Sequence, residues 1–200
     1  MFDSYQAPAF TIAKFQIIYD GWAGRIIRIL LFLLGLAYAA TSVGWVSDLS
    51  ALSVNPLTYL WGIFITWDIF YQLKIRTFNV GDPVGSSDNL AVSFSTRSAR
   101  ILLESGGPDL GKIFARTLRT PFAKFVTAKL GFNITDLKRF GDWGSWDSYL
   151  KSLQTVVGKE GWSYVTEHDL LSALAGIDGP FKQVLFEKGV KEEDLRNVLF

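Results

Sequence analysis

Two long apolar runs near the start of the chain constrain its fold more than any other feature. No charged residue occurs from Ile29 to Ser47, a run of 19 residues, and a second apolar segment from Leu57 to Leu73 carries a single charge, Asp68. A helix rises about 1.5 Å per residue, so runs of this length approach the roughly 30 Å of a bilayer's hydrocarbon core. They predict a transmembrane helical hairpin over residues 24–76, with a turn near residues 47–56. Two buried helices of a globular protein are the alternative.

Basic residues flank the outer ends of this predicted hairpin. Arg25 and Arg28 precede the first run, Lys74 and Arg76 follow the second, and the turn between the runs carries only Asp48. Cytoplasmic flanks of membrane helices are enriched in Lys and Arg. The sequence therefore predicts an integral protein of the inner or plasma membrane, with both termini and the following domain in the cytoplasm.

The segments on either side of the predicted hairpin are short. Apolar and aromatic residues recur at helical spacing over residues 1–23, which favours an interfacial helix lying on the membrane or, alternatively, a disordered leader. Residues 77–91 contain Gly, Pro and Ser at short intervals and are predicted to form a linker. The charge density of a water-soluble domain begins at residue 92.

Residues 92–200 show the same order of helix signals twice. In each half an Asp-Leu pair precedes a Pro-Phe pair, which is typical of the first residues of a helix, and a Gly follows where that helix ends. The matching signals are Asp109-Leu110 and Asp169-Leu170, then Pro121-Phe122 and Pro180-Phe181, then Gly131 and Gly189. The pattern predicts an all-α domain of two repeated helical units, about 92–141 and 142–200, that bury their apolar faces against each other.

The second copy carries the most distinctive motif, Thr166-Glu167-His168-Asp169-Leu170-Leu171, followed by Phe181 and by Gly189-Val190. In these motifs and their order, residues 92–200 resemble the N-terminal domain, or Clp repeat domain, of Clp-type AAA+ unfoldases. The first copy departs from the family pattern, because Gly106-Gly107-Pro108 stands where a Thr-Glu-His sequence would. The resemblance implies a module that receives substrate or adaptor proteins and passes them to an AAA+ unfoldase ring, in cis or in trans.

The resemblance also implies where such proteins would bind. Some members of the family recognise phosphorylated arginine through the Glu of this motif in each repeat, and Glu167 matches that position whereas Gly107 does not. Taken without the resemblance, the sequence favours a structural role for both residues. His168 would be a packed ring in the first turn of a capped helix, and Glu167 an acid that interacts with the helix dipole. The predicted protein-binding residues are Thr166, Glu167, His168, Asp169, Phe181 and Lys188.

Charge is divided unevenly between the two copies. Residues 105–141 contain seven Lys and Arg against two Asp and Glu, whereas residues 142–200 contain six against ten. The basic copy would suit anionic lipid headgroups; alternatively, the opposite charges help the two copies to dock. The predicted membrane-surface residues are Lys74, Arg76, Lys112, Arg116 and Arg119.

Composition excludes several kinds of site. The chain has no Cys and one His, and it lacks the G-x-x-x-x-G-K-[ST] motif of a P-loop. We therefore predict no catalytic, metal, cofactor or nucleic-acid site here, and any ATPase motor would lie beyond Phe200 or in another chain. The predicted function is a membrane-anchored recognition module for a Clp-type unfoldase or protease, with protein clients, a lipid bilayer and further copies of itself as partners. The alternative is a small integral membrane transport or assembly subunit that uses the hairpin and Asp68.

Overall fold

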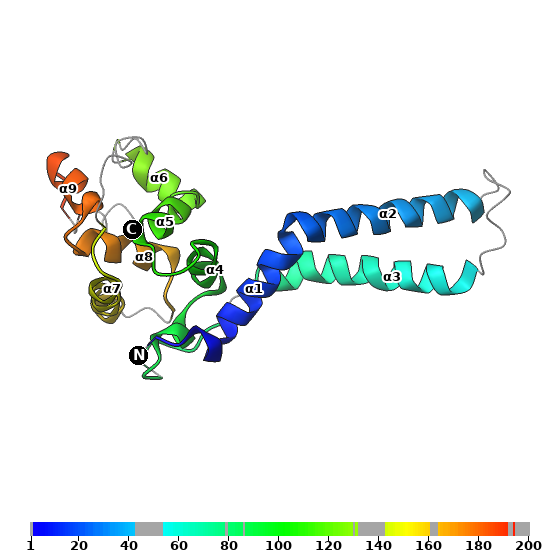
Figure 1. Cartoon of the computed structure of the whole chain (residues 1–200), viewed down its shortest axis with the longest axis horizontal. Coiled ribbons are helices and arrows are strands. Elements are labelled where there is room, and N and C mark those ends of the chain that lie inside the picture. The colour runs from blue at the N-terminus through cyan, green and yellow to red at the C-terminus, as the bar shows by residue number, and fades with distance from the viewer. Residues whose placement is uncertain are drawn as a thin grey trace. The chain divides into compact units, whose positions relative to one another are not determined.

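The computed structural model describes residues 2–42, 54–78, 80–85, 87–129, 131, 143–160, 164–191 and 194. Every regular element within these residues is a helix (Figure 1), which confirms the predicted all-α class for this part of the chain. The chain divides into two compact units. Residues 15–78 form the hairpin unit, and residues 1–14 together with 79–200 form the large unit. The predicted turn near residues 47–56 and the predicted boundary between the two copies lie largely outside the described residues.

Two long helices make up most of the hairpin unit. α2 runs from Trp22 to Ser42 and α3 from Val54 to Phe70, and a π-helix, η2, follows over Tyr71–Ile75. α2 and α3 lie side by side (Figure 1). Gly35 of α2 is buried, and a Cβ atom built on it would overlap the indole of Trp61 on α3. The missing side chain at Gly35 therefore makes room for Trp61.

The predicted localisation as an integral membrane protein is contradicted by the helices that the structure describes. No helix in the described part of the chain combines the length and the apolar composition that crossing a bilayer requires.

The first residues of the chain pack into the core of the large unit. The ring of Phe2 lies edge-on against Phe10, Phe94 and Trp146, with ring centroids 5.6–5.8 Å apart. Phe10 itself is buried. The structure thus places the first part of the segment predicted as an interfacial helix or disordered leader, residues 1–23, among buried aromatic rings.

Hydrogen bonds fix the same segment to the residues that precede the first repeat. Asp3 donates its backbone N–H to Asn89 Oδ1, and Asn89 Nδ2 donates to the Asp3 carbonyl, each over 2.8 Å. Asp3 begins the short helix η1 (Ser4–Gln6) and Asn89 begins η3 (Leu90–Ser93). α1 (Pro8–Asp20) follows, and its last residues belong to the hairpin unit.

Six further helices, α4 to α9, build the large unit, and five of them pack around the sixth, α8. α8 (Glu167–Gly176) contacts all the others, and seven of its residues are buried. Its neighbours are α4 (Thr96–Glu104), α5 (Leu110–Thr117), α6 (Pro121–Lys129), α7 (Trp146–Glu160) and α9 (Pro180–Glu187). The core therefore sits on both sides of α8, with the more polar helices around it.

Side-chain caps begin the helices where the sequence predicted them. Asp109 accepts a hydrogen bond from the Lys112 N–H over 3.0 Å and caps α5, and Thr166 with Asp169 forms a capping box at the start of α8. The two Asp residues matched in the sequence are therefore not equivalent. Asp109 is an N-cap, whereas Asp169 is the third residue of its helix and Thr166 is the N-cap.

Candidate functional site

A parallel β-bridge sets the position of the predicted binding motif. The bridge joins Phe94 and Val165: Ser95 donates its N–H to the Val165 carbonyl over 2.9 Å, and Val165 donates to the Ser93 carbonyl over 2.8 Å. Ser95 is the N-cap of α4 and the residue after Val165 is the N-cap of α8. The first turns of these two helices therefore lie next to each other.

Asp169 is the buried residue of this motif and does not reach the surface. Its side chain is fully buried, and its Oδ2 accepts hydrogen bonds from the Thr166 N–H over 2.6 Å and from the Thr166 hydroxyl over 2.8 Å. Its Oδ1 has no hydrogen-bond partner among the described residues and lies 4.0 Å from His168 Nδ1. Asp169 therefore holds the start of α8 in place and is inaccessible to a partner protein.

Tyr149 of α7 forms a hydrogen bond to the backbone of α8. Its side chain is buried, and its hydroxyl donates to the Leu170 carbonyl over 3.4 Å. Burial raises the pKa of Tyr149 well above its usual range, and the nearby Asp169 carboxylate raises it further. The hydroxyl thus stays protonated and remains a hydrogen-bond donor to the first turns of α8.

Glu167 and His168 are each partly covered by a neighbouring helix. Glu167 forms an ion pair with Arg97 of α4, with Oε1 and Nη1 2.9 Å apart. The ring of His168 lies edge-on against Phe122 of α6, with centroids 5.4 Å apart, and its Nε2 is 3.5 Å from the Ser172 hydroxyl. The sequence did not predict Arg97, because it lies 70 residues from Glu167 and no local signal connects them.

The two remaining predicted protein-binding residues, Phe181 and Lys188, both belong to α9 or its C-cap, but only Lys188 is exposed. Phe181 is only 1% exposed and packs against Phe114 with ring centroids 4.9 Å apart, so a partner protein could not reach its side chain in this conformation. The reason is helical spacing, since Phe181, Val184 and Leu185 share the buried face. Phe186 falls outside this face and is 86% exposed. Applying the i, i+3, i+4 rule to α9 in the sequence would have found it.

Lys188 and the predicted membrane-surface residues lie on the outside of their units. Lys188 is the exposed C-cap of α9. Lys112 pairs with Asp109 over 3.2 Å, Arg116 pairs with Glu104 over 3.5 Å, and Arg119 is exposed. The Lys112 backbone N–H, and then its side chain, lower the pKa of Asp109 below its ordinary value. Lys74 and Arg76 are exposed in the hairpin unit.

The acidic residue predicted in the second apolar run, Asp68, is part of a polar cluster in the hairpin unit. Its Oδ1 accepts a hydrogen bond from the Tyr19 hydroxyl over 2.9 Å and lies 3.6 Å from Arg28 Nη1. The guanidinium of Arg28 also lies over the Tyr19 ring, 4.8 Å from its centroid. Asp68 is thus held by partners from α1 and α2.

This cluster should shift the titration of Tyr19. Burial, and then the hydrogen bond to Asp68, raise the pKa of Tyr19 to about 12 from an ordinary value near 10. The folded pKa lies above the unfolded one, so the stability contributed by this hydroxyl is complete below pH about 10 and is lost as the pH rises through 12. The phenolate absorbance of the chain minus that of Tyr19→Phe should therefore titrate near pH 12. A difference midpoint near 10 would contradict this, and Asp68→Asn should move the midpoint downward.

No group of three His, Asp or Glu side chains suited to a metal ion occurs among the described residues. An apolar cavity of about 390 Å³ lies between the N-terminal segment and α4, and Phe2, Phe10, Leu102 and Trp146 are among the residues that line it. Comparison of the chain with protein-family models, with curated proteins and with solved structures gives no match.

Proposed function

We propose that the large unit is a protein-recognition module that binds substrate or adaptor proteins for a Clp-type AAA+ unfoldase or protease system. The observation that carries this proposal is Phe186, an aromatic side chain that is 86% exposed on a helix whose other face is core. Exposed aromatic residues are frequent anchors of protein interfaces, because a partner that covers them removes a large apolar area from water. The resemblance of residues 92–200 to the Clp repeat domain supports the same function.

The packing beneath Phe186 is suited to this task. α9 packs against α8, and its buried face includes Phe181, Val184 and Leu185. The start of α8 is held by the capping box of Thr166 and Asp169. A side chain displayed from a rigid element loses little conformational freedom on binding, so more of its contact energy appears as affinity. Lys188, the exposed C-cap of α9, adds a positive charge at the end of this helix.

The proposal is tested by binding to a permanently unfolded protein. Fluorescently labelled, reduced and carboxymethylated α-lactalbumin is titrated with the full chain, and fluorescence anisotropy gives the Kd. We expect Phe186→Ala to weaken binding about tenfold, since loss of an aromatic anchor costs on the order of 1.4 kcal/mol. Phe186→Leu should recover part of the affinity.

Tyr5→Ala is the matched control for this measurement. Tyr5 belongs to the same unit and is also 86% exposed, but it lies on η1 rather than on α9. Equal losses in Phe186→Ala and Tyr5→Ala would show nonspecific adhesion of apolar surface. Failure of the unmodified chain to bind the unfolded probe would also count against the proposal.

A further inference from the structure

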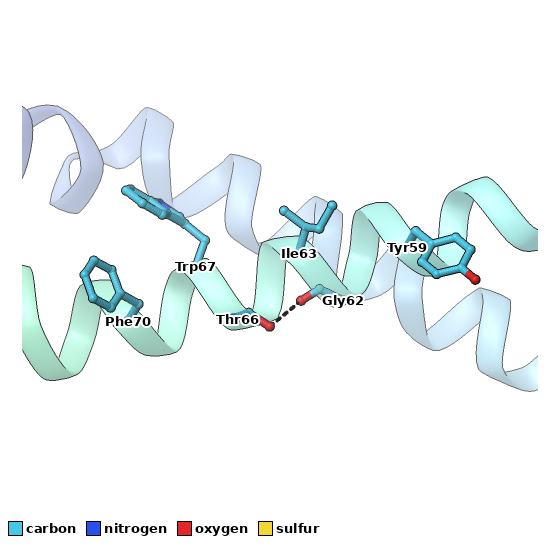
Figure 2. Close-up of a pocket in the computed structure, with 6 residues that line it drawn as sticks. All are labelled: Tyr59, Gly62, Ile63, Thr66, Trp67 and Phe70. Atoms are coloured by element: carbon cyan, nitrogen blue, oxygen red, sulfur yellow. Dashed lines mark hydrogen bonds between the residues drawn. The ribbon is translucent and has the colours of Figure 1, made fainter.

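One face of α3 forms an open apolar groove of about 560 Å³ in the hairpin unit. Figure 2 shows the six residues that line it, which all come from this helix. They recur at spacings of three and four and so follow a single helical face. The lining residues are Tyr59, Gly62, Ile63, Thr66, Trp67 and Phe70.

The groove presents no charged side chain to an occupant. The Thr66 hydroxyl donates to the Gly62 carbonyl over 2.8 Å (Figure 2), so its hydrogen-bonding capacity is used within the helix. The single charged residue of α3, Asp68, is hydrogen-bonded to Tyr19 instead. An apolar partner could therefore enter without leaving a buried charge. The Tyr59 hydroxyl and the Trp67 Nε1–H are the other donors that line the groove, and each needs water or a partner atom at the edge of the contact.

Gly62 opens the middle of the groove. A Cβ atom built on Gly62 would meet nothing within 4 Å, so the helix backbone is accessible there. Tyr59, Ile63 and Trp67 form a ridge of large side chains at spacings of four beside the small residues Gly62 and Thr66. A ridge and a shallow furrow side by side on one helix are self-complementary, because the ridge of one copy can pack into the furrow of another.

The exposed area of the groove suits a weak dimer. The four large lining side chains are 42–73% exposed, which at about 100 Å² each amounts to roughly 400 Å² of apolar surface. Monomers rarely expose apolar patches beyond a few hundred Å². A standard interface buries about 800 Å² per partner, so a contact of this size predicts a concentration-dependent equilibrium rather than a permanent dimer.

We infer that a second copy of this chain covers the groove, with α3 packed against α3 of the partner about a twofold axis near Gly62 and Thr66. The contact is isologous, so each copy contributes both ridge and furrow. The face carries no charge and therefore meets no like-charge repulsion in this arrangement. This dimer concerns the hairpin unit and is independent of protein recognition by the large unit.

The test is sedimentation equilibrium of the full chain in detergent-free buffer over a range of protein concentrations. We expect a monomer–dimer equilibrium, and we expect Ile63→Arg to raise the dimer Kd at least about 100-fold, because a guanidinium would be buried against apolar side chains. Ile69→Arg is the matched control: Ile69 lies on the same helix and is 53% exposed, but it does not line the groove. This control should dimerise like the unmodified chain, and circular dichroism should show equal helix content in all three proteins.

A second measurement uses the absence of Cys from the chain. Thr66→Cys places one thiol near the proposed twofold axis, so mild oxidation should give a covalent dimer, whereas Ile69→Cys should not. A chain that stays monomeric at all concentrations would overturn the inference. Equal effects of the two Arg variants would overturn it too. So would a monomer that floats with phosphatidylcholine vesicles, because lipid would then cover the groove.

Discussion

Truncation of Phe181 to alanine is expected to lower the free energy of unfolding of the large unit by about 3–5 kcal/mol. The side chain is almost fully buried, and its ring packs against Phe114 of α5, so the variant leaves a cavity where α9 meets the core. A domain has only about 5–15 kcal/mol of stability in total. Chemical denaturation followed by circular dichroism measures the loss.

Phe186→Ala is the matched control for this prediction. The same residue type is removed from the same helix five positions later, but the side chain is exposed, so stability should change by less than about 0.5 kcal/mol. The two variants thus separate folding from binding on one helix. Comparable destabilisation by both would show that the assignment of the buried and exposed faces of α9 is wrong.

Gly35→Ala is expected to destabilise the packing of α2 on α3 by about 1–3 kcal/mol. In most helices this substitution is favourable, because alanine has the higher helix propensity by about 1 kcal/mol. At Gly35 the new methyl group would overlap the rigid indole of Trp61, so one helix must move away from the other. Thermal unfolding of the full chain, followed by circular dichroism, gives the change.

Gly62→Ala, on α3, is the matched control, since nothing lies within 4 Å of a Cβ atom at that position. In dilute solution, where the chain is monomeric, this variant should be as stable as the original or more stable by about 0.5–1 kcal/mol. If both variants were stabilised equally, Gly35 would not be a packing position and the account of the hairpin unit would fail.

Helix positions in the large unit were largely predictable because their signals are local. Asp109 and Thr166 begin α5 and α8, and Pro121 and Pro180 are the first residues of α6 and α9. Caps and prolines act on the few residues beside them, so the sequence alone reveals them. The prediction failed for the hairpin unit's localisation, because no helix among the described residues is both long and apolar enough to cross a bilayer.

The candidate site depended on contacts between distant segments. Glu167 is covered by Arg97, 70 residues earlier, and Asp3 is bonded to Asn89, 86 residues later. Such pairs form only when several helices have packed, and no spacing rule in the sequence connects them.

The sequence by itself determined that this chain is helical, where several of its helices begin, and that two of them are strongly apolar. Only the tertiary structure decided which side of each helix is available to a partner. Phe181 and Phe186 are the same residue type on the same short helix, yet one is in the core and the other is in solvent. The reason is physical: helix formation depends on local backbone and capping interactions, whereas exposure depends on which neighbouring helices cover each face.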